Sequence, residues 1–139
     1  MIGLGAIGVL VANAANALGM KVIGFDPFVS IDAAWKLSHE VQKAASLDAL
    51  IAESDYITIH VPATKDTKNL FNAERIGRMK KGARLMNFSR NGLVDNAAIK
   101  AAIASGQVAG YVIDLPEDEL LGVDKILCVP HLGLSLIHI

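Results

Sequence analysis

The sequence predicts an α/β fold, a Rossmann-type doubly wound parallel sheet with helices on both faces. Three observations lead to this prediction. A glycine-rich turn opens the chain, segments typical of strands and helices alternate along it, and the strand-like segments are nearly continuous apolar runs. Such alternation is typical of βαβ units, and continuous apolar strands indicate a sheet covered on both faces. With 139 residues, 53% of them hydrophobic, the chain can form one domain with its own core.

The first element is a turn with the sequence Gly3-Leu4-Gly5-Ala6-Ile7-Gly8, followed by an alanine-rich helix over 6–18. In a dinucleotide-binding fold, the first glycine makes the tight turn and the second lets the backbone approach a pyrophosphate. The third lets the helix pack on the sheet, with its N-terminal N–H groups facing the phosphates. We therefore predict a dinucleotide site here, with an ordinary tight βα turn as the alternative.

The second strand is expected over 20–25, and Asp26 follows Gly8 by 18 residues. This is close to the spacing of about 20 at which an acid accepts hydrogen bonds from the adenine ribose. The carboxylate would repel a 2′-phosphate, and Pro27 and Phe28 supply no arginine to neutralise one. The predicted cofactor is therefore NAD rather than NADP.

The strand before the glycine turn is unusual, because only Met1 and Ile2 precede Gly3. In a doubly wound sheet this strand is central, and strands usually have about 3–10 residues. Two residues should not hold their neighbours by ordinary ladder pairing. We therefore expect the chain to be a fragment in which the first strand is truncated.

The later elements follow from hydrophobic periodicity and from cap and turn residues. Ser46 can cap a helix, Pro62 ends a strand, Gly106 stops a helix, and Lys80 and Lys81 lie where a helix C-terminus favours cations. The expected helices are 31–36, 46–53, 72–79 and 95–105, and the expected strands are 40–44, 55–61, 83–88, 108–113 and 126–129.

Polar residues follow several of these strands, where ligands bind to open parallel sheets. They are Asp26, His60, Arg90, Asp114 and His131. An arginine can hold a carboxylate with two hydrogen bonds, a histidine can exchange a proton near neutral pH, and an acid can fix the histidine tautomer. Alone, each has an ordinary interpretation as an ion pair, a loop histidine or a solvated turn. Together they indicate hydride transfer to or from a hydroxy acid.

Charge and cysteine content limit the partners and the compartment. The net charge of −1 gives no electrostatic case for nucleic acid or an anionic membrane, and no metal site is predicted. The first 18 residues are apolar but lack the basic start of a signal peptide. The lone Cys128 cannot form an internal disulfide, and we interpret it as a buried strand residue in a cytoplasmic protein.

Several segments, in the right order, resemble the D-isomer-specific 2-hydroxyacid dehydrogenase family. They are Gly3–Gly8, Gly19–Pro27, Asn87–Asp95, Asp114 with the acids after it, and Pro130–Gly133. The resemblance implies that residues 1–135 form an NAD-binding domain, and that the separate substrate domain is missing from the chain. It implies a homo-oligomer, a dimer or larger, for the full-length protein. Residues 136–139 look like nothing in the family and are interpreted as a tail that is either foreign or misread.

The resemblance also implies roles for individual residues. Arg90 would bind the substrate, His131 would be the acid/base, and Glu119, five residues after Asp114, would be the carboxylate paired with it. Departures from the family are Asn91 in place of a glycine and Leu120 in place of a proline. The implied cofactor-binding residues are Gly3, Gly5, Ala6, Ile7, Gly8, Asp26, Val61, Phe88, Ser89, Arg90, Asp114, His131 and Gly133.

Within the family, the likeness is strongest to members that oxidise 3-phosphoglycerate to 3-phosphohydroxypyruvate at the entry to serine synthesis. A glyoxylate/hydroxypyruvate or D-lactate reductase is the first alternative. A non-catalytic NAD-sensing module, as in corepressors that share the fold, is the second, and turnover with a 2-hydroxy acid separates the two classes. We expect little or no activity from the 139 residues alone.

Overall fold

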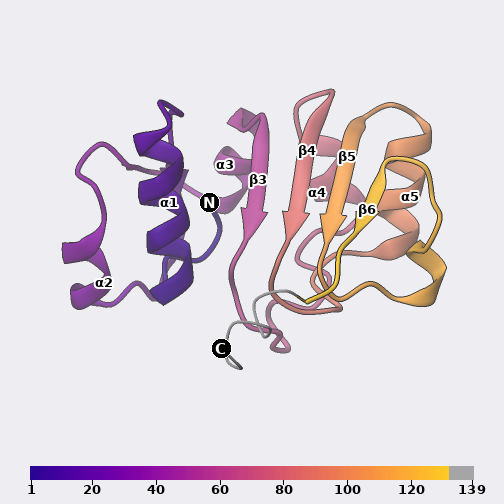
Figure 1. Ribbon diagram of the computed structural model, residues 1–139. Coiled ribbons are helices and arrows are strands. Elements are labelled where there is room, and N and C mark those ends of the chain that lie inside the picture. Colours follow the sequence, from indigo (N-terminus) through magenta and orange to yellow (C-terminus); the bar gives the residue numbers. More distant parts are fainter. Residues whose placement is uncertain (132–139) are drawn as a thin grey trace.

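The computed structural model describes residues 1–131 and has the expected α/β architecture (Figure 1). The helices are α1 (Ala6–Ala17), α2 (Ile31–Lys36), α3 (Leu47–Glu53), α4 (Ala73–Arg78) and α5 (Asn96–Ala104), with a 3-10 turn, η1 (Asp118–Leu120). The strands are β1 (Ile23–Gly24), β2 (Gln42–Lys43), β3 (Tyr56–Ile59), β4 (Ala83–Asn87), β5 (Val108–Ile113) and β6 (Ile126–Cys128). The predicted order of elements is confirmed, although β1 and β2 are shorter than expected.

All strand pairs are parallel, in a two-stranded sheet β1-β2 and a four-stranded sheet β3-β4-β5-β6. Ile2 joins the two, because it forms parallel bridges to both Phe25 and Ile59. Its N–H donates to Thr58 O at 3.0 Å, and its carbonyl accepts from His60 N at 2.7 Å. The sheet therefore runs β2, β1, Ile2, β3, β4, β5, β6, and the order of strands reverses at Ile2.

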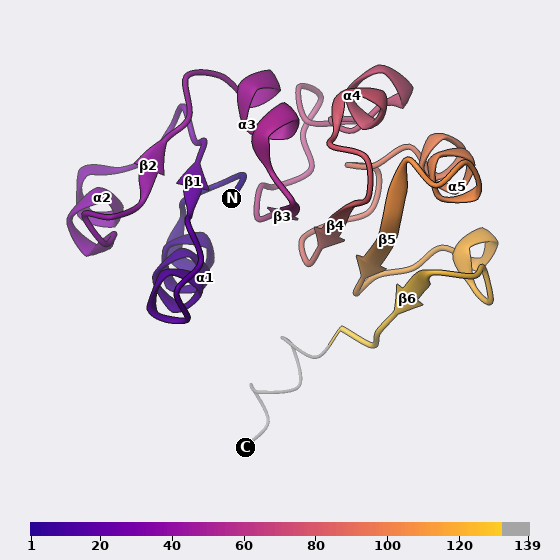
Figure 2. The same cartoon turned by 90° about the horizontal axis from the view of Figure 1, so that it is seen from above.

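As expected, residues 1 and 2 form no strand of an ordinary ladder, but the isolated bridges of Ile2 carry backbone hydrogen bonds to both neighbours. On the side of β1, Met1 O accepts from Phe25 N and Gly3 N donates to Phe25 O, both at 2.9 Å. Successive peptide groups thus serve opposite neighbours, so that even this short segment pairs on both sides. Figure 2 shows the N-terminus lying between β1 and β3, in the middle of the sheet.

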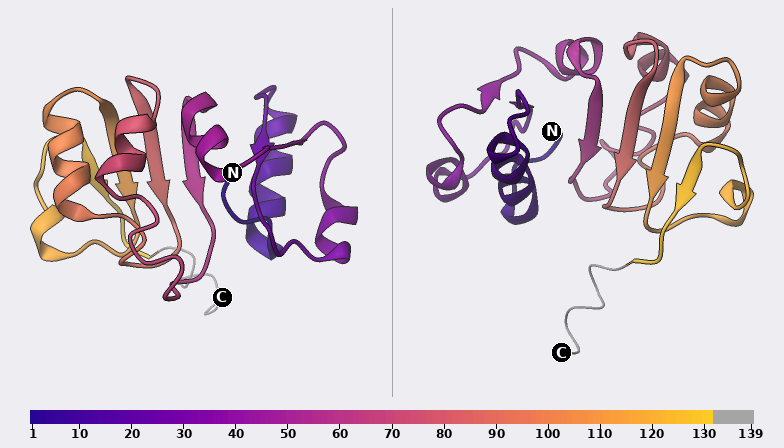
Figure 3. Two further views of the ribbon diagram at one scale, coloured as in Figure 1. Left: turned by 180° about the vertical axis from the view of Figure 1, so that it is seen from behind. Right: turned by 45° about the horizontal axis from the view of Figure 1, so that its top comes forward.

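The helices lie on both faces of the sheet. Helices α3, α4 and α5 lie on one face, and α1 lies on the other beside β1, with α2 next to it (Figures 2 and 3). The larger core lies between the sheet and helices α3, α4 and α5, and it contains the fully buried Leu50, Ile57, Leu85 and Ile99. A smaller core under α1 consists of Met1, Leu4, Val9, Ala12 and Val22. No helix in residues 1–131 is long and apolar enough to cross a membrane.

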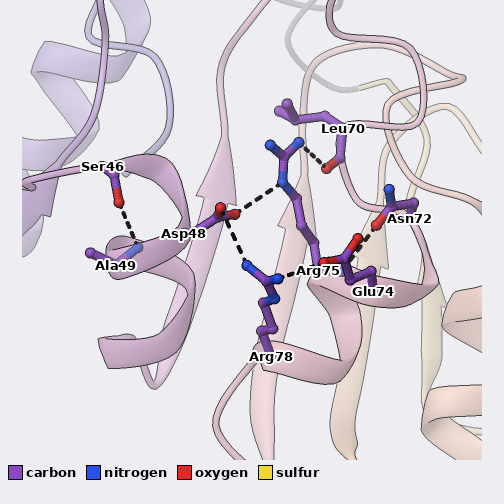
Figure 4. A network of polar contacts seen from close by, with 8 residues as sticks. All are labelled: Ser46, Asp48, Ala49, Leu70, Asn72, Glu74, Arg75 and Arg78. Atoms are coloured by element: carbon purple, nitrogen blue, oxygen red, sulfur yellow. Dashed lines mark hydrogen bonds and ion pairs between the residues drawn. The ribbon is translucent and has the colours of Figure 1, made fainter.

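Helices α3 and α4 are joined by a polar network on the surface (Figure 4). The Asp48 carboxylate lies 3.2 Å from Arg75 Nε and 3.4 Å from Arg78 Nη1. The Arg75 guanidinium also donates to Leu70 O at 3.0 Å, and Asn72 caps α4. Because these ion pairs are partly exposed, each contributes at most about 1 kcal/mol to folding. They link the two short helices and add little to the free energy of folding.

Candidate functional site

The glycine turn between Ile2 and α1 is dictated by close backbone packing. Gly3 has a φ of +86°, and a Cβ there would lie 2.5 Å from His60 O. A Cβ at Gly8 would lie 2.1 Å from Gly3 O, so the helix can approach the turn only without a side chain. Both glycines are thus required by the fold itself.

Gly5 differs from the other two glycines in the turn. A Cβ at Gly5 would meet no atom of residues 1–131 within 4 Å, and no described side chain caps the start of α1. The exposed Ala6 and Ile7 begin the helix, where unpaired N–H groups and the helix dipole favour an anion. No contact among residues 1–131 calls for glycine at this position, and the open space above Gly5 fits the close approach of a ligand phosphate.

Asp26 connects the glycine turn to the loop after β1. Its Oδ2 accepts from Leu4 N, and its Oδ1 accepts from Phe28 N, both at 2.8 Å. The half-buried carboxylate is therefore held in one orientation at the carboxyl end of β1. A carboxylate has about four acceptor positions, so it can still accept hydrogen bonds from ribose hydroxyls. The residues present thus fit the adenosine diphosphate part of NAD.

The turn after β4, which carries Arg90, is built around a buried amide. Asn87, only 1% exposed, donates through Nδ2 to Arg90 O at 2.9 Å and accepts from Ser89 N at 3.1 Å. Ser89 Oγ donates to Ile59 O at 2.6 Å, which ties the turn to β3. The Arg90 guanidinium is exposed at the carboxyl edge of the sheet. Gly92, with a φ of +78°, supplies the left-handed residue of this turn.

Asn87 was not predicted as a site residue. Its only signal in the sequence is a polar residue at the end of an apolar strand. Val61, half-buried after β3, and Phe88, 43% exposed after β4, lie at the same edge as the turn. Gly133 and residues 132–139, with the predicted domain end at 135 and the tail at 136–139, lie outside the described residues.

Asp114 and His131 come together where β5 and β6 end. His131 Nδ1 lies 3.0 Å from Asp114 Oδ2, and the two side chains are only 20% and 8% exposed. Nearby, His60 Nε2 is 2.9 Å from Thr58 Oγ1. Burial lowers the pKa of His60, the positive N-terminus lowers it further, and Asp114 opposes both effects. His60 is therefore neutral at neutral pH.

Among residues 1–131 the structure shows other partners for Glu119 than His131, and the expected pairing of the two stays a prediction. Glu119, in η1, accepts from Asn96 Nδ2 at 2.8 Å and pairs with Lys100 Nζ at 2.6 Å, both on α5. These hydrogen bonds lower the pKa of Glu119, which is charged at neutral pH. Its neighbour Leu120 is fully buried and belongs to the larger core.

The structure places a glycine turn, an acid after β1, an arginine after β4 and a histidine after β6 at one edge of a doubly wound sheet. A sequence profile described as "D-isomer specific 2-hydroxyacid dehydrogenase, NAD binding domain" matches residues 1–133. The chain belongs to this family of NAD-binding domains.

Two relatives of the chain are dehydrogenases by name. D-3-phosphoglycerate dehydrogenase of Synechocystis sp. is 40% identical over 141 aligned positions, gaps included, and the alignment covers 97% of this chain and 25% of the relative. Glycerate dehydrogenase of Methylorubrum extorquens is 40% identical over 128 residues, 92% of this chain and 37% of the relative. The chain thus spans between a quarter and two fifths of the length of these relatives.

Solved structures show the same fold. The NAD-complexed D-isomer specific 2-hydroxyacid dehydrogenase of Lactobacillus delbrueckii ssp. bulgaricus superimposes with a TM-score of 0.80 at 29% identity, over 94% of this chain and 44% of that one. The pyruvate reductase of Chlamydomonas reinhardtii gives a TM-score of 0.84 at 32% identity, over 95% and 46%. The Rossmann-type fold and the NAD cofactor are therefore confirmed.

Proposed function

We propose that this domain works in an enzyme that transfers hydride between NAD and a D-2-hydroxy acid, with 3-phosphoglycerate oxidised to 3-phosphohydroxypyruvate. The relatives named D-3-phosphoglycerate dehydrogenase support this substrate. The main supporting observation is that Arg90 and the His131–Asp114 pair lie at the same edge as the glycine turn. Such an enzyme would work in the cytoplasm as a dimer or a larger homo-oligomer.

Each residue has a proposed task. The start of α1 at Gly5 would hold the diphosphate of the cofactor, and Asp26 the adenine ribose. Bound NAD supplies the hydride acceptor for oxidation and the hydride donor for reduction. Arg90 would hold the substrate carboxylate and polarise the reacting oxygen, and His131 would take the hydroxyl proton during oxidation and return it during reduction.

Calorimetric titration of the chain with NADH and with NADPH tests the cofactor that the proposal assigns. We expect NADH to bind at least about 10-fold more tightly than NADPH, because Asp26 repels the 2′-phosphate. The Asp26→Asn variant, which keeps the shape of the side chain, should reduce this preference. Equal affinities for both dinucleotides, or no binding, would contradict the proposed site.

Turnover tests the substrate part, in a protein that contains this domain together with its substrate domain. We expect 3-phosphoglycerate to be the best substrate among 3-phosphoglycerate, glycerate and D-lactate. Preference for glycerate, the substrate that the Methylorubrum extorquens relative's name indicates, would favour the glycerate or hydroxypyruvate alternative. NADH binding without turnover of any of these acids would favour an NAD-sensing module.

A further inference from the structure

A single buried amide holds both ends of the segment that carries Arg90. Asn87, the last residue of β4 and only 1% exposed, donates to Arg90 O at 2.9 Å and accepts from Ser89 N at 3.1 Å. The opposite orientation of the amide would set oxygen against oxygen and N–H against N–H, so the two roles cannot be exchanged. A buried amide costs free energy unless it is hydrogen-bonded, and here both bonds go to the Ser89-Arg90 segment.

The guanidinium of Arg90 depends on the same segment. It donates through Nη1 to Ser89 O at 2.7 Å, and this carbonyl lies between the two groups that Asn87 holds. Ser89 is fixed a second time, because its Oγ donates to Ile59 O at 2.6 Å. The place of the guanidinium is therefore set by backbone groups that are themselves anchored.

Ile59, the last residue of β3, also connects this segment to the glycine turn. The next residue, His60, donates through its backbone N–H to Ile2 O at 2.7 Å, and a Cβ at Gly3 would lie 2.5 Å from His60 O. The glycine turn and the Arg90 turn are thus both built on the end of β3. Their relative position is set by backbone contacts rather than by long side chains.

We propose that Asn87 is a positioning residue, which holds the Ser89-Arg90 segment so that the exposed guanidinium faces the carboxylate of a hydroxy acid beside bound NAD. This role rests on the proposed function, in which Arg90 binds the substrate. Arginine has five N–H donors, and the bond to Ser89 O uses one, so four remain for a carboxylate. Because the guanidinium is planar and binds a carboxylate with two parallel bonds, displacement of its backbone weakens both.

Kinetics of two variants test this role in a protein that contains the domain together with its substrate domain. Asn87→Asp keeps the shape and the acceptor for Ser89 N but loses the donor to Arg90 O, and Asn87→Ala loses both. We expect kcat/KM to fall about 10-fold or more in Asn87→Asp, mainly through a higher KM for the hydroxy acid, and further in Asn87→Ala. The affinity for NADH should stay close to that of the wild type, because the glycine turn is untouched.

Gln107→Glu is the matched control. Gln107 lies at the opposite edge of the sheet, before β5, and its amide donates to Met79 O at 2.7 Å and to Gly77 O at 3.3 Å. The variant thus loses bonds from an amide to backbone carbonyls, as Asn87→Asp does, but far from the site. It should lower stability and leave the KM for the hydroxy acid unchanged.

The wild-type chain gives a second measurement, which holds even if the Asn87 variants do not fold. Backbone ¹⁵N relaxation yields order parameters, about 0.85 for a rigid backbone and below about 0.6 for a flexible one. We expect Ser89 and Arg90 to be as ordered as β4, although Arg90 is exposed. In Asn87→Asp the order parameters of both residues should fall while those of β4 stay the same.

Four results would overturn the role of Asn87. They are order parameters at Arg90 well below those of β4 in the wild type, a wild-type KM in folded Asn87 variants, equal losses of hydroxy-acid and NADH binding, and an equal rise in KM in Gln107→Glu. Failure of the proposed function is recognised separately. It shows as a wild-type protein that turns over no 2-hydroxy acid, whereas the order parameters need no substrate.

Discussion

The amino half of the chain (residues 1–44) and the carboxyl half (residues 45–131) hold their parts of the site in different ways. The amino half has two strands of two residues each, a core of five residues, and Leu18, Phe28 and Trp35 more than 80% exposed. The carboxyl half has a continuous four-stranded ladder and the larger core. The turn that would grip the cofactor is thus set by backbone contacts between glycines, whereas the residues proposed for catalysis are set by strands and buried side chains.

The largest difference between the halves should appear in their cores. Ile57→Ala removes a fully buried side chain of the carboxyl half and should cost about 2–5 kcal/mol of unfolding free energy. Val9→Ala, in the amino half, removes two carbons rather than three and should cost about 1–2 kcal/mol, at about 0.8 kcal/mol per carbon. Urea unfolding of both variants measures this. Equal losses would mean that the smaller core is packed as tightly as the larger one.

High pH should lower the stability of the fold through a tyrosine of the carboxyl half. Burial raises the pKa of Tyr111 to about 12, whereas a tyrosine in the unfolded chain ionises near pH 10. The contribution of neutral Tyr111 to the free energy of unfolding is complete below pH 10 and is lost as the pH rises to about 12. The total loss is about 3 kcal/mol. Urea unfolding of the wild type and of Tyr111→Phe at several alkaline pH values isolates this loss.

The Tyr111→Phe variant should lack this fall in stability. At pH 8 it should be at least as stable as the wild type, because the buried hydroxyl has no hydrogen-bond partner among residues 1–131. An identical fall in both proteins between pH 10 and 12 would assign it to other groups. A large loss of stability in the variant at pH 8 would reveal a hydrogen bond to this hydroxyl.

Substitutions in the glycine turn separate folding from binding. Gly8→Ala would place a methyl group against Gly3 O and should lower the free energy of unfolding by about 1–3 kcal/mol. The same change should also abolish NADH binding, because it displaces the turn. Gly5→Ala is the matched control, since its methyl group meets no described atom within 4 Å. It should fold normally and still bind NADH more weakly. Thermal unfolding and NADH titration measure the two effects, and normal NADH binding by Gly8→Ala would contradict this view of the turn.

The smallest effect is expected at the surface network between α3 and α4. Asp48→Asn removes two partly exposed ion pairs and should cost less than about 1 kcal/mol, with the difference reduced in 1 M salt, where the Debye length is about 3 Å. Asp55→Asn, which breaks the exposed pair with Lys80, is the control. A loss several times larger for Asp48→Asn alone would show that the network holds the carboxyl half together.

The sequence predicts those parts of the structure that depend on local patterns. The roles of Gly3 and Gly8 follow from spacing, because only glycine fits where the backbone approaches so closely. The edge that carries Asp26, Arg90 and His131 follows from the alternation of strands and helices. The short β1 and β2 could not be predicted, since hydrogen bonding to neighbouring segments, rather than composition, decides where a strand ends.

The part that could not be predicted depends on contacts between distant residues. The direction of Glu119 is set by Asn96 and Lys100, which precede it by 23 and 19 residues, and by the burial of Leu120. The five-residue spacing from Asp114 to Glu119 indicates neither the contacts with α5 nor the burial of Leu120. The pairing of Ile2 with both neighbours was missed for a related reason, because a rule about strand length ignores the backbone partners that a single residue finds on each side.

The double hydrogen bond of Asp26 has a consequence for attempts to redesign coenzyme preference. Its carboxylate restrains the turn through Leu4 and the loop through Phe28, besides its proposed contact with the ribose. Exchanging it for a small or basic residue, the usual route to accept a phosphorylated ribose, would release both segments at once. A successful redesign would have to introduce a replacement acceptor, such as a serine or asparagine oxygen, before the negative charge is removed.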